Sequence, residues 1–368
     1  MQPGLYVHVP FCRGKCPYCG FYSIASKAPI ERWLAGLEKE IFHTQEHQVG
    51  PFDSLYLGGG TPSFLSHTVL ERVMATIFSH YPLTPDAEIT LEANPCDISP
   101  EKANLFKSLG FNRINLGVQS LNDRVLTFLG RMHSSKNAEN ALKHLRSAGF
   151  QNVGVDLIYG FKAQSMNEWI ATLQRALAFQ PEHLSCYQLT LEKGTVFERR
   201  SHRKSGITLP EKIAAAHFLA TSSFLESKGY NQYEVSNFVR DESLEARHNR
   251  KYWQHIPYLG LGPSAHSFDG KKRWWNVRSV KKYCEALEKD FLPVEGSETL
   301  TKEQIHLESL ALGFRTSRGV DVGFLSPKFE KTLLMFQKRG LLKVVNGRAV
   351  PTRRGYLLAD HLPLHFSD

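Results

Sequence analysis

Short apolar runs alternate with longer amphipathic stretches along residues 1–230 of the chain. The apolar runs have the length of strands and lie at 5–9, 54–57, 87–92, 113–117, 152–158 and 183–189. The stretches between them have the length of helices and lie at 30–45, 68–79, 100–109, 136–148, 167–179 and 210–228. A spacing of roughly 30 to 40 residues is typical of βα units around a parallel sheet. The pattern therefore predicts an α/β fold whose six strands suffice for a partial barrel.

The alternation loosens from Glu192, and a different pattern begins near residue 296. Helical periodicity covers 302–313 and 327–339. Two short strands follow at 341–345 and 348–351, joined by an Asn-Gly turn, and a final helix is expected at 354–361. This order looks like a winged helix. We therefore expect three parts: a partial barrel at 1–230, a connecting segment at 231–295, and a winged-helix-like α+β domain at 296–368.

The composition is ordinary for a globular protein, with 42% hydrophobic and 22% charged residues. No apolar run is long enough to cross a bilayer, and no basic stretch followed by an apolar core opens the chain, so we expect a cytoplasmic protein without a transmembrane segment. Lys and Arg outnumber Asp and Glu by 45 to 36. A basic balance attracts anionic partners. No distinctly basic recognition helix is evident, and we expect no nucleic-acid partner.

Three of the six cysteines, Cys12, Cys16 and Cys19, lie close together directly after the first predicted strand. Thiolates bind iron-sulfur clusters, and three of them leave one iron of a 4Fe-4S cluster open to another ligand. A zinc site is the alternative, with His8 as the fourth ligand. The other three cysteines are scattered and are expected to be buried small hydrophobes.

Further polar groups and glycines stand where predicted strands end, which is where barrel enzymes place their chemistry. Gly58, Gly59 and Gly60 follow the second strand and leave room for a close approach of backbone and ligand, or simply for a tight turn. Glu92 and Gln119 end or follow the third and fourth strands. Asp156 interrupts the apolar fifth strand, where an unpaired carboxylate is costly.

The cysteine spacing, with Tyr18 before the third cysteine, resembles the radical S-adenosylmethionine (SAM) superfamily. The segment Tyr6-Val-His-Val-Pro-Phe-Cys12 and the segment Gly58-Gly-Gly-Thr-Pro62 resemble, more narrowly, oxygen-independent coproporphyrinogen III oxidases and the related HemW heme chaperones. The resemblance implies a (β/α)6 partial barrel, a 4Fe-4S cluster held by the three cysteines, and SAM at the open iron with its adenine beside Tyr18. Family positions that line the SAM site are matched by Tyr6, Gly59, Gly60, Thr61, Glu92, Gln119, Arg131 and Asp156.

A second motif, His248-Asn-Arg-Lys-Tyr-Trp253, resembles the HNxxYW segment of HemW proteins that is implicated in heme binding. By this resemblance His248 is a candidate axial ligand of heme iron, and Trp253 a contact for the macrocycle. The alternative is that Tyr252 and Trp253 belong to the core and that His248 caps a turn.

The sequence favours a heme chaperone over an enzyme. The oxidases carry a further cysteine where this chain has Phe21, and they have an extension before the cluster loop, whereas Cys12 is close to the start of this sequence. The expected function is delivery of heme to acceptor proteins, such as membrane-associated respiratory proteins. A coproporphyrinogen III oxidase or a related radical SAM methylase remains an alternative. If SAM is cleaved, an electron donor such as flavodoxin or ferredoxin is expected.

Overall fold

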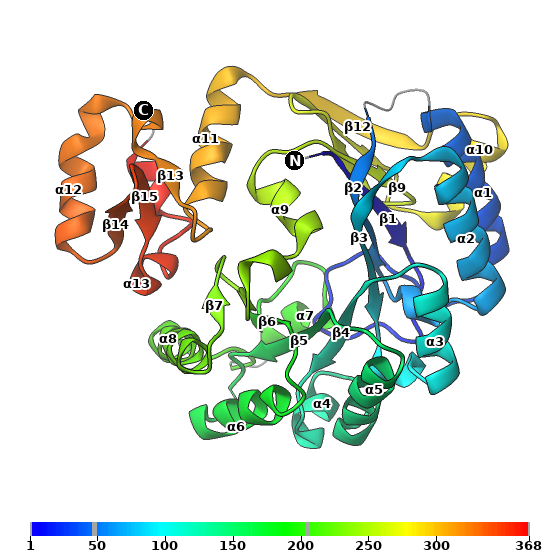
Figure 1. The fold of residues 1–368 in the computed structure, drawn as a ribbon, viewed down its shortest axis with the longest axis horizontal. Coiled ribbons are helices and arrows are strands. Elements are labelled where there is room, and N and C mark those ends of the chain that lie inside the picture. The colour runs from blue at the N-terminus through cyan, green and yellow to red at the C-terminus, as the bar shows by residue number, and fades with distance from the viewer. Residues whose placement is uncertain (1, 46–49, 163, 203–205, 367–368) are drawn as a thin grey trace.

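The computed structural model describes residues 2–45, 50–162, 164–202 and 206–366. Six parallel strands form the centre of the sheet: β1 (Gly4–Val9), β2 (Phe52–Gly59), β3 (Leu83–Ala93), β4 (Arg113–Gln119), β5 (Val153–Tyr159) and β6 (His183–Gln188). Figure 1 shows that the sheet curves and that helices follow its outer side. These helices include α1 (Ile30–Thr44), α2 (His67–His80), α3 (Pro100–Ser108), α4 (Asp123–Phe128), α5 (Ser135–Ser147), α6 (Met166–Leu177) and α8 (Glu211–Ser227). The predicted strands and helices of the partial barrel are confirmed.

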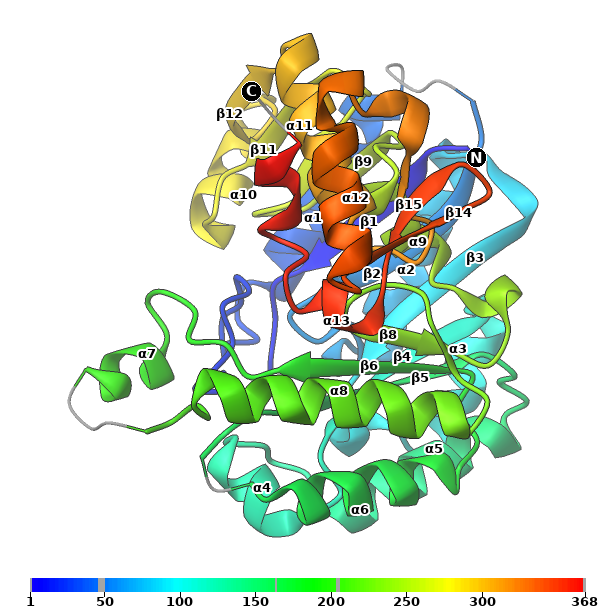
Figure 2. The ribbon, with the colours of Figure 1, turned by 90° about the vertical axis from the view of Figure 1, so that its left-hand side faces the viewer.

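Local sequence explains where these helices begin and which face they bury. Ser134 and Ser165 open α5 and α6 with capping boxes, completed by Asn137 and Glu168. In α5 the side chains of alanines and leucines at helical spacing face the sheet and are fully or nearly fully buried: Ala138, Ala141, Leu142 and Leu145. Helices α6 and α8 lie side by side across the lower strands in Figure 2.

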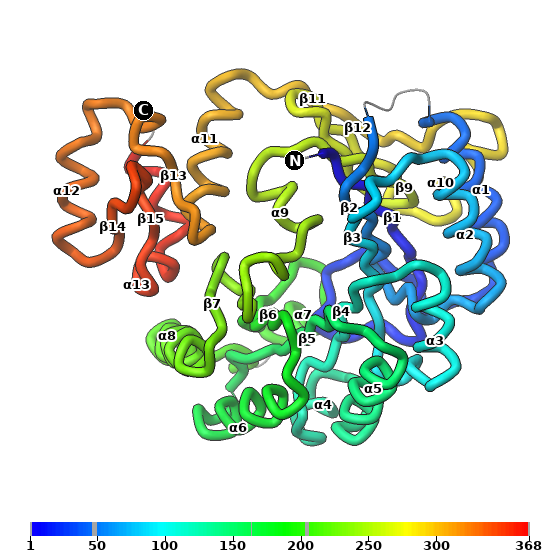
Figure 3. Tube along the Cα trace, viewed as in Figure 1, coloured from blue at the N-terminus to red at the C-terminus, as the bar shows by residue number. Residues whose placement is uncertain are grey.

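The segment expected as a connection, 231–295, adds strands to both edges of the same sheet. On one edge β8 (Asn237–Val239) pairs with β6, and β7 (Asn231–Gln232) follows it. On the other edge β9 (Tyr258–Leu261) pairs in parallel with β1. Beyond it lie β10 (His266–Phe268), β11 (Lys272–Asn276) and β12 (Val294–Thr299). The same segment contains the helices α9 (Arg247–Trp253) and α10 (Val280–Glu288), while the short helix α7 (Val196–Ser201) lies earlier, between β6 and α8. Figure 3 shows the start of the chain beside α9, where the Gly4 amide donates to the Pro257 carbonyl.

The C-terminal residues have a hydrophobic cluster of their own, which includes Leu310, Phe314, Phe336 and Leu342. The elements are α11 (Lys302–Gly313), β13 (Val320–Asp321), α12 (Glu330–Lys338), β14 (Leu342–Val345), β15 (Arg348–Pro351) and α13 (Arg353–Tyr356). The strands form a sheet in the order β13-β15-β14. The winged-helix interpretation of this unit stays a prediction.

The final helix is much shorter than the expected 354–361, because α13 ends at Tyr356. Leu362 and Phe366 are each 1% exposed, so the chain turns after Tyr356 to bring both side chains into the C-terminal cluster.

No helix within the described ranges combines the length and apolar character needed to span a membrane.

Candidate functional site

A cavity of about 770 Å³ opens at the carboxyl ends of the central strands. We call it the barrel cavity. It brings together most of the residues predicted from the sequence: Cys12, Cys16, Tyr18, Cys19, Gly59, Gly60, Thr61, Glu92, Gln119, Arg131 and Asp156. Tyr6, His248 and Trp253 are absent from the residues that line it.

The cysteine loop forms one wall of the barrel cavity. Two side chains from the barrel donate to its sulfur atoms: Thr61 Oγ1 to Cys12 Sγ and Arg131 Nη1 to Cys16 Sγ, both at 3.4 Å. Such donors stabilise negative charge on thiolates. The three thiols and these two donors therefore suit a thiolate-bound metal cluster.

The zinc alternative loses its fourth ligand in this structure. His8 Nδ1 lies 3.0 Å from the Tyr6 hydroxyl, and His8 Nε2 lies 2.9 Å from the Tyr22 carbonyl. Within the described ranges, no three Cys, His, Asp or Glu side chains are grouped so that they could hold one metal ion. Ligands of a single zinc ion stand within about 4 Å of one another. Three thiolates match a 4Fe-4S cluster with one open iron, so the loop favours the iron-sulfur interpretation.

The glycine turn is packed tightly against the cysteine loop. The Gly60 amide donates to the Val9 carbonyl and the Thr61 amide to the Phe11 carbonyl, each at 2.8 Å. Gly59 has a φ of +102°, and a Cβ added there would lie 2.4 Å from the His8 ring. The chain's own atoms thus require glycine at this position, because both the backbone conformation and the space exclude a side chain.

Glu92 is held at the cavity wall by two donors. The Tyr56 hydroxyl donates to Oε1 at 2.7 Å, and the Gly59 amide donates to Oε2 at 3.0 Å. Asn115 Nδ2 in turn donates to the Tyr56 hydroxyl at 3.2 Å. Desolvation by burial raises the pKa of Glu92 to about 7, and burial likewise raises the pKa of Asp156 to about 6. Two carboxyl groups of this kind can accept hydrogen bonds from the hydroxyl groups of a ligand.

Tyr56 and Asn115 were not predicted as site residues from the sequence, although both line the barrel cavity. The alternation of side chains between the two faces of a strand could have indicated both residues. Asn115 shares a face of β4 with Gln119, which the sequence did single out.

The comparisons with known proteins agree with this geometry. A family model, the Radical SAM superfamily, matches residues 6–176. The heme chaperone HemW of Mycobacterium tuberculosis (strain ATCC 25618 / H37Rv) is 36% identical over 365 residues, covering 98% of this chain and 93% of that protein. The heme chaperone HemW of Bacillus subtilis (strain 168) is 34% identical over 370 residues, covering 97% of both. The chain belongs to the HemW family. The resemblance drawn from the cysteine loop and the glycine turn is confirmed.

A solved structure supports the same fold for this HemW family member. The coproporphyrinogen III oxidase HemN from Escherichia coli, a radical SAM enzyme, matches with a TM-score of 0.86 and 25% identity. The match covers 100% of this chain and 90% of that one. The radical SAM α/β fold is therefore confirmed.

Arg131 links the cysteine loop to the sheet. Its Nη2 donates to the Gly117 carbonyl at 2.7 Å, while Nη1 also lies 3.5 Å from the Tyr18 hydroxyl. Gln119, at the end of the same strand, has a φ of +64°, which is uncommon for a residue with a side chain. Arg131, Tyr18 and Gln119 thus lie on neighbouring parts of the cavity wall. The Nε2 atom of His133 lies within hydrogen-bond distance of the Val118 carbonyl, at 3.0 Å.

The HNxxYW motif forms helix α9, and its histidine is buried in the core. His248 is 1% exposed, with Nδ1 3.2 Å from Ser54 Oγ and Nε2 2.9 Å from the Tyr252 hydroxyl. Its ring lies 6.0 Å from the Tyr6 ring and 5.2 Å from the Tyr56 ring. Burial lowers the pKa of His248 to about 3. Axial ligation by His248 stays a prediction, and in this structure both of its ring nitrogens already have partners.

Replacing Glu92 with glutamine should weaken SAM binding and stabilise the cluster-free protein at alkaline pH. Burial raises the pKa of Glu92 to about 7 in the folded protein. Protonated Glu92 therefore stabilises the folded state fully below the pKa that glutamate has in the unfolded chain, and this stabilisation is lost as the pH rises through 7. Glutamine keeps the site neutral. We expect the glutamine variant to have a free energy of unfolding about 1 to 2 kcal/mol higher than the wild type at pH 8. The gain is no larger because solvent in the open cavity reduces the cost of the ionised Glu92 carboxylate in the wild type.

Urea unfolding of both forms at pH 5 and pH 8 measures this difference. A much smaller gain at pH 5 is expected, and an equal gain at both pH values would show that the charge of Glu92 is not the cause.

Proposed function

We propose that the chain is a heme chaperone that binds heme, a 4Fe-4S cluster and SAM, and that delivers heme to acceptor proteins. The observation that carries the proposal is the near full-length similarity to proteins named heme chaperone HemW, at 34% to 36% identity. The barrel cavity supports the cofactor part, because its three cysteine thiols, glycine turn and paired carboxyl groups stand together.

The chain's own residues would divide the work at the barrel cavity. Cys12, Cys16 and Cys19 would hold the cluster, which when bound offers one open iron to the polar end of SAM. Thr61 and Arg131 would stabilise the charge of the thiolates by donating to sulfur.

Other side chains would bind the nucleoside part of SAM. Glu92, Gln119 and Asp156 would accept or donate hydrogen bonds to the ribose, and Tyr18 would lie beside the adenine. Tyr56 and Asn115 would keep the Glu92 carboxylate in place.

An oxygen-independent coproporphyrinogen III oxidase is the second candidate, favoured by the match to the E. coli oxidase structure. The residue at position 21 argues against an oxidase. Phe21, at the position where the oxidases carry a further cysteine, is 70% exposed at the cavity and offers no thiol. A related radical SAM methylase is supported by no separate feature of the cavity.

The proposal implies heme and heme acceptors as partners, among them membrane-associated respiratory proteins, and flavodoxin or ferredoxin as the electron donor if SAM is cleaved. It also implies a cytoplasmic location, where scattered thiols such as Cys96, Cys186 and Cys284 stay reduced.

Anaerobic incubation tests the proposed function against the alternative. The cluster-loaded protein is given either hemin or coproporphyrinogen III together with SAM and a reductant, and the tetrapyrroles are analysed by chromatography. We expect saturable heme binding and transfer to an apo-hemoprotein, with coproporphyrinogen III unchanged. Efficient formation of protoporphyrinogen IX would replace the chaperone assignment with the oxidase.

A further inference from the structure

Residues of β1 and β2 form layers that lead from helix α9 to the barrel cavity. The parallel register aligns three pairs of residues: Gly4 with Ser54, Tyr6 with Tyr56, and His8 with Gly58. Alternate residues of a strand face the same side of the sheet, so the three pairs lie on one face. The last pair adjoins the glycine turn, since a Cβ added at Gly59 would meet the His8 ring.

His248 fills the space of the first layer. Its side chain is 1% exposed, and a Cβ added at Gly4 would lie 3.0 Å from its Nδ1 atom. The Ser54 hydroxyl lies 3.2 Å from the same nitrogen. Glycine at position 4 therefore leaves room for the imidazole of a helix that is far away in the sequence.

The imidazole of His248 packs on both tyrosines of the second layer. The ring centres lie 6.0 Å from Tyr6 and 5.2 Å from Tyr56, and the planes are inclined by 29° and 30°. The Tyr56 hydroxyl donates to Glu92 Oε1 at 2.7 Å, and the Tyr6 hydroxyl lies 3.0 Å from His8 Nδ1. Packing that fixes a side chain also fixes the groups to which it is bonded. His248 thus restricts the two hydroxyls that hold Glu92 and His8.

Helix α9 is itself fixed to the neighbouring strands. The Arg247 amide donates to Glu88 Oε1 at 2.8 Å. Lys251 forms a buried ion pair with Asp53, and separating such a pair would leave a charge uncompensated in the interior. The helix also contributes directly to the barrel cavity, because Asn249 lines it. The motif is therefore held where it can support that cavity.

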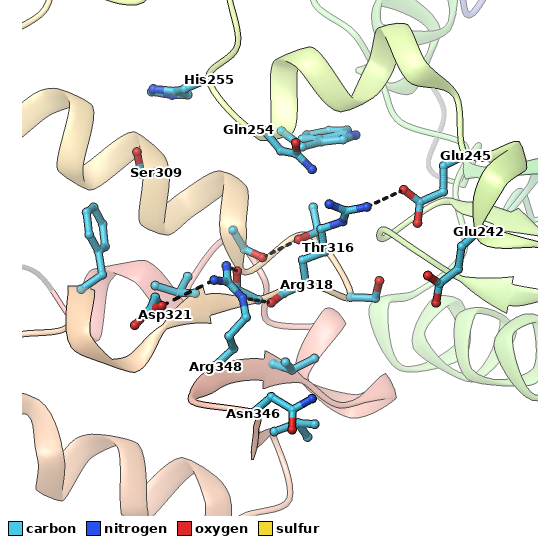
Figure 4. A pocket seen from close by; sticks show the side chains of 18 residues that line it. Glu242, Glu245, Gln254, His255, Ser309, Thr316, Arg318, Asp321, Asn346 and Arg348 are labelled. Atoms are coloured by element: carbon cyan, nitrogen blue, oxygen red, sulfur yellow. Dashed lines mark hydrogen bonds and ion pairs between the residues drawn. The ribbon is translucent and has the colours of Figure 1, made fainter. Parts of the chain in front are cut away.

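The other end of α9 borders a second cavity, of about 820 Å³ (Figure 4). Figure 4 shows that two arginines at its wall are directed toward carboxylates: Arg318 toward Glu245, and Arg348 toward Asp321. Trp253 lines this second cavity, whereas His248 and Asn249 do not. The histidine and the asparagine of the motif thus lie on the side of the barrel.

We propose that His248 is a positioning residue of the SAM site and acts through Tyr6 and Tyr56. Without the imidazole the two tyrosine rings can tilt, so that Glu92 and His8 lose their fixed hydroxyl partners. This inference rests on the proposed function and adds to its SAM site a residue that lies outside the cavity wall. The role needs no bond between His248 and iron, and it is therefore distinct from axial ligation of heme.

SAM binding isotherms of the cluster-loaded protein test this role. We compare His248→Ala, Tyr56→Phe and the double variant with the wild type. His248→Ala should weaken SAM binding by roughly tenfold and keep the wild-type cluster content. The double variant should bind SAM about as weakly as the weaker single variant, because both changes disturb the bond between Tyr56 and Glu92. Losses that multiply in the double variant would show independent action and would overturn the proposal.

His217→Ala is the matched control for the loss of a buried histidine. His217 is 2% exposed, belongs to α8, and stacks on Tyr159 at 6.4 Å. Neither residue lines the barrel cavity. This variant should unfold at a lower urea concentration than the wild type, as His248→Ala does, but should keep the wild-type SAM affinity. An equal loss of SAM affinity in the control would reduce the effect of His248 to general destabilisation and overturn the role.

Gly4→Ala tests the role without removing the imidazole. The added Cβ would lie 3.0 Å from His248 Nδ1 and 3.0 Å from Ser54 Oγ, so the ring has to shift. SAM affinity should fall by about threefold, with the cluster retained. Wild-type SAM affinity in both Gly4→Ala and His248→Ala would overturn the role and leave the SAM site in place.

Hemin titration of the same samples, followed by Soret absorbance, separates the role from heme ligation. We expect His248→Ala to keep the wild-type heme affinity and spectrum. Weakened heme binding together with normal SAM binding would assign His248 to heme and overturn the positioning role. Absence of SAM binding by the cluster-loaded wild type would instead overturn the SAM part of the proposed function itself.

Discussion

Replacing Cys16 with serine should remove nearly all of the iron-sulfur cluster from the anaerobically purified protein. A cluster of four irons with only three protein thiolates has no spare ligand, and the serine hydroxyl is a much weaker ligand for iron than a thiolate. Cys16 also accepts a hydrogen bond from Arg131 Nη1, which the variant would alter, while Arg131 keeps its bond to the Gly117 carbonyl. Iron and sulfide analysis, with the absorbance of the cluster, gives the measurement. The same loss is expected for Cys12→Ser and Cys19→Ser.

Cys96→Ser is the matched control, because Cys96 is an exposed free cysteine outside the loop. The expectation that Cys96 is buried is therefore wrong, whereas Cys186 and Cys284 are buried as predicted. It should keep roughly one cluster per chain, as the wild type does. Stoichiometric zinc without sulfide in the wild type would contradict the cluster assignment.

Gly59→Val should abolish SAM binding and destabilise the protein. The backbone φ of +102° excludes a β-branched residue, and the added Cβ would meet the His8 ring at 2.4 Å. His8 would have to move, and with it the bonds to Tyr6 and Tyr22 that support the cysteine loop. Strained backbone and overpacking together should cost about 2 to 5 kcal/mol in the free energy of unfolding. Urea unfolding and a SAM binding isotherm measure the two effects.

Gly149→Val separates steric exclusion from backbone strain. Gly149 has a φ of +80° but nothing within 4 Å of an added Cβ. This variant should lose only the strain contribution, about 1 to 2 kcal/mol, and should bind SAM normally. Normal SAM binding by Gly59→Val would show that the glycine turn does not shape the site.

The barrel and much of its cavity could be predicted from the sequence, because both depend on local patterns. Each strand and helix of the βα units has its own periodicity and caps, as Ser134 and Ser165 illustrate. Parallel strands also bring their carboxyl ends to one edge, so Glu92, Gln119 and Asp156 could be grouped from the sequence alone. Glycine is required at position 59 for a reason that the sequence did not indicate. Its missing side chain makes room for the His8 ring as well as for a ligand.

The parts that the sequence did not reveal depend on contacts between distant segments. His248 meets Ser54, which is 194 residues away, and no local pattern indicates that the motif's histidine faces inward. Strand β9 joins β1 across most of the chain, although its glycine-rich sequence gave no strand signal. A second cavity, of about 820 Å³, likewise combines the end of α9 with residues near 320 and 348.

The electron paramagnetic resonance spectrum of the reduced wild type, recorded with and without SAM, tests the central claim most directly. That claim is that the three cysteines leave one iron open inside the barrel cavity, where SAM binds. SAM carrying a nitrogen-15 amino group adds a label that a directly bound iron would detect as hyperfine coupling. We predict a shifted spectrum with coupling to the labelled nitrogen. An identical spectrum with and without saturating SAM, and no coupling to the label, would contradict the account.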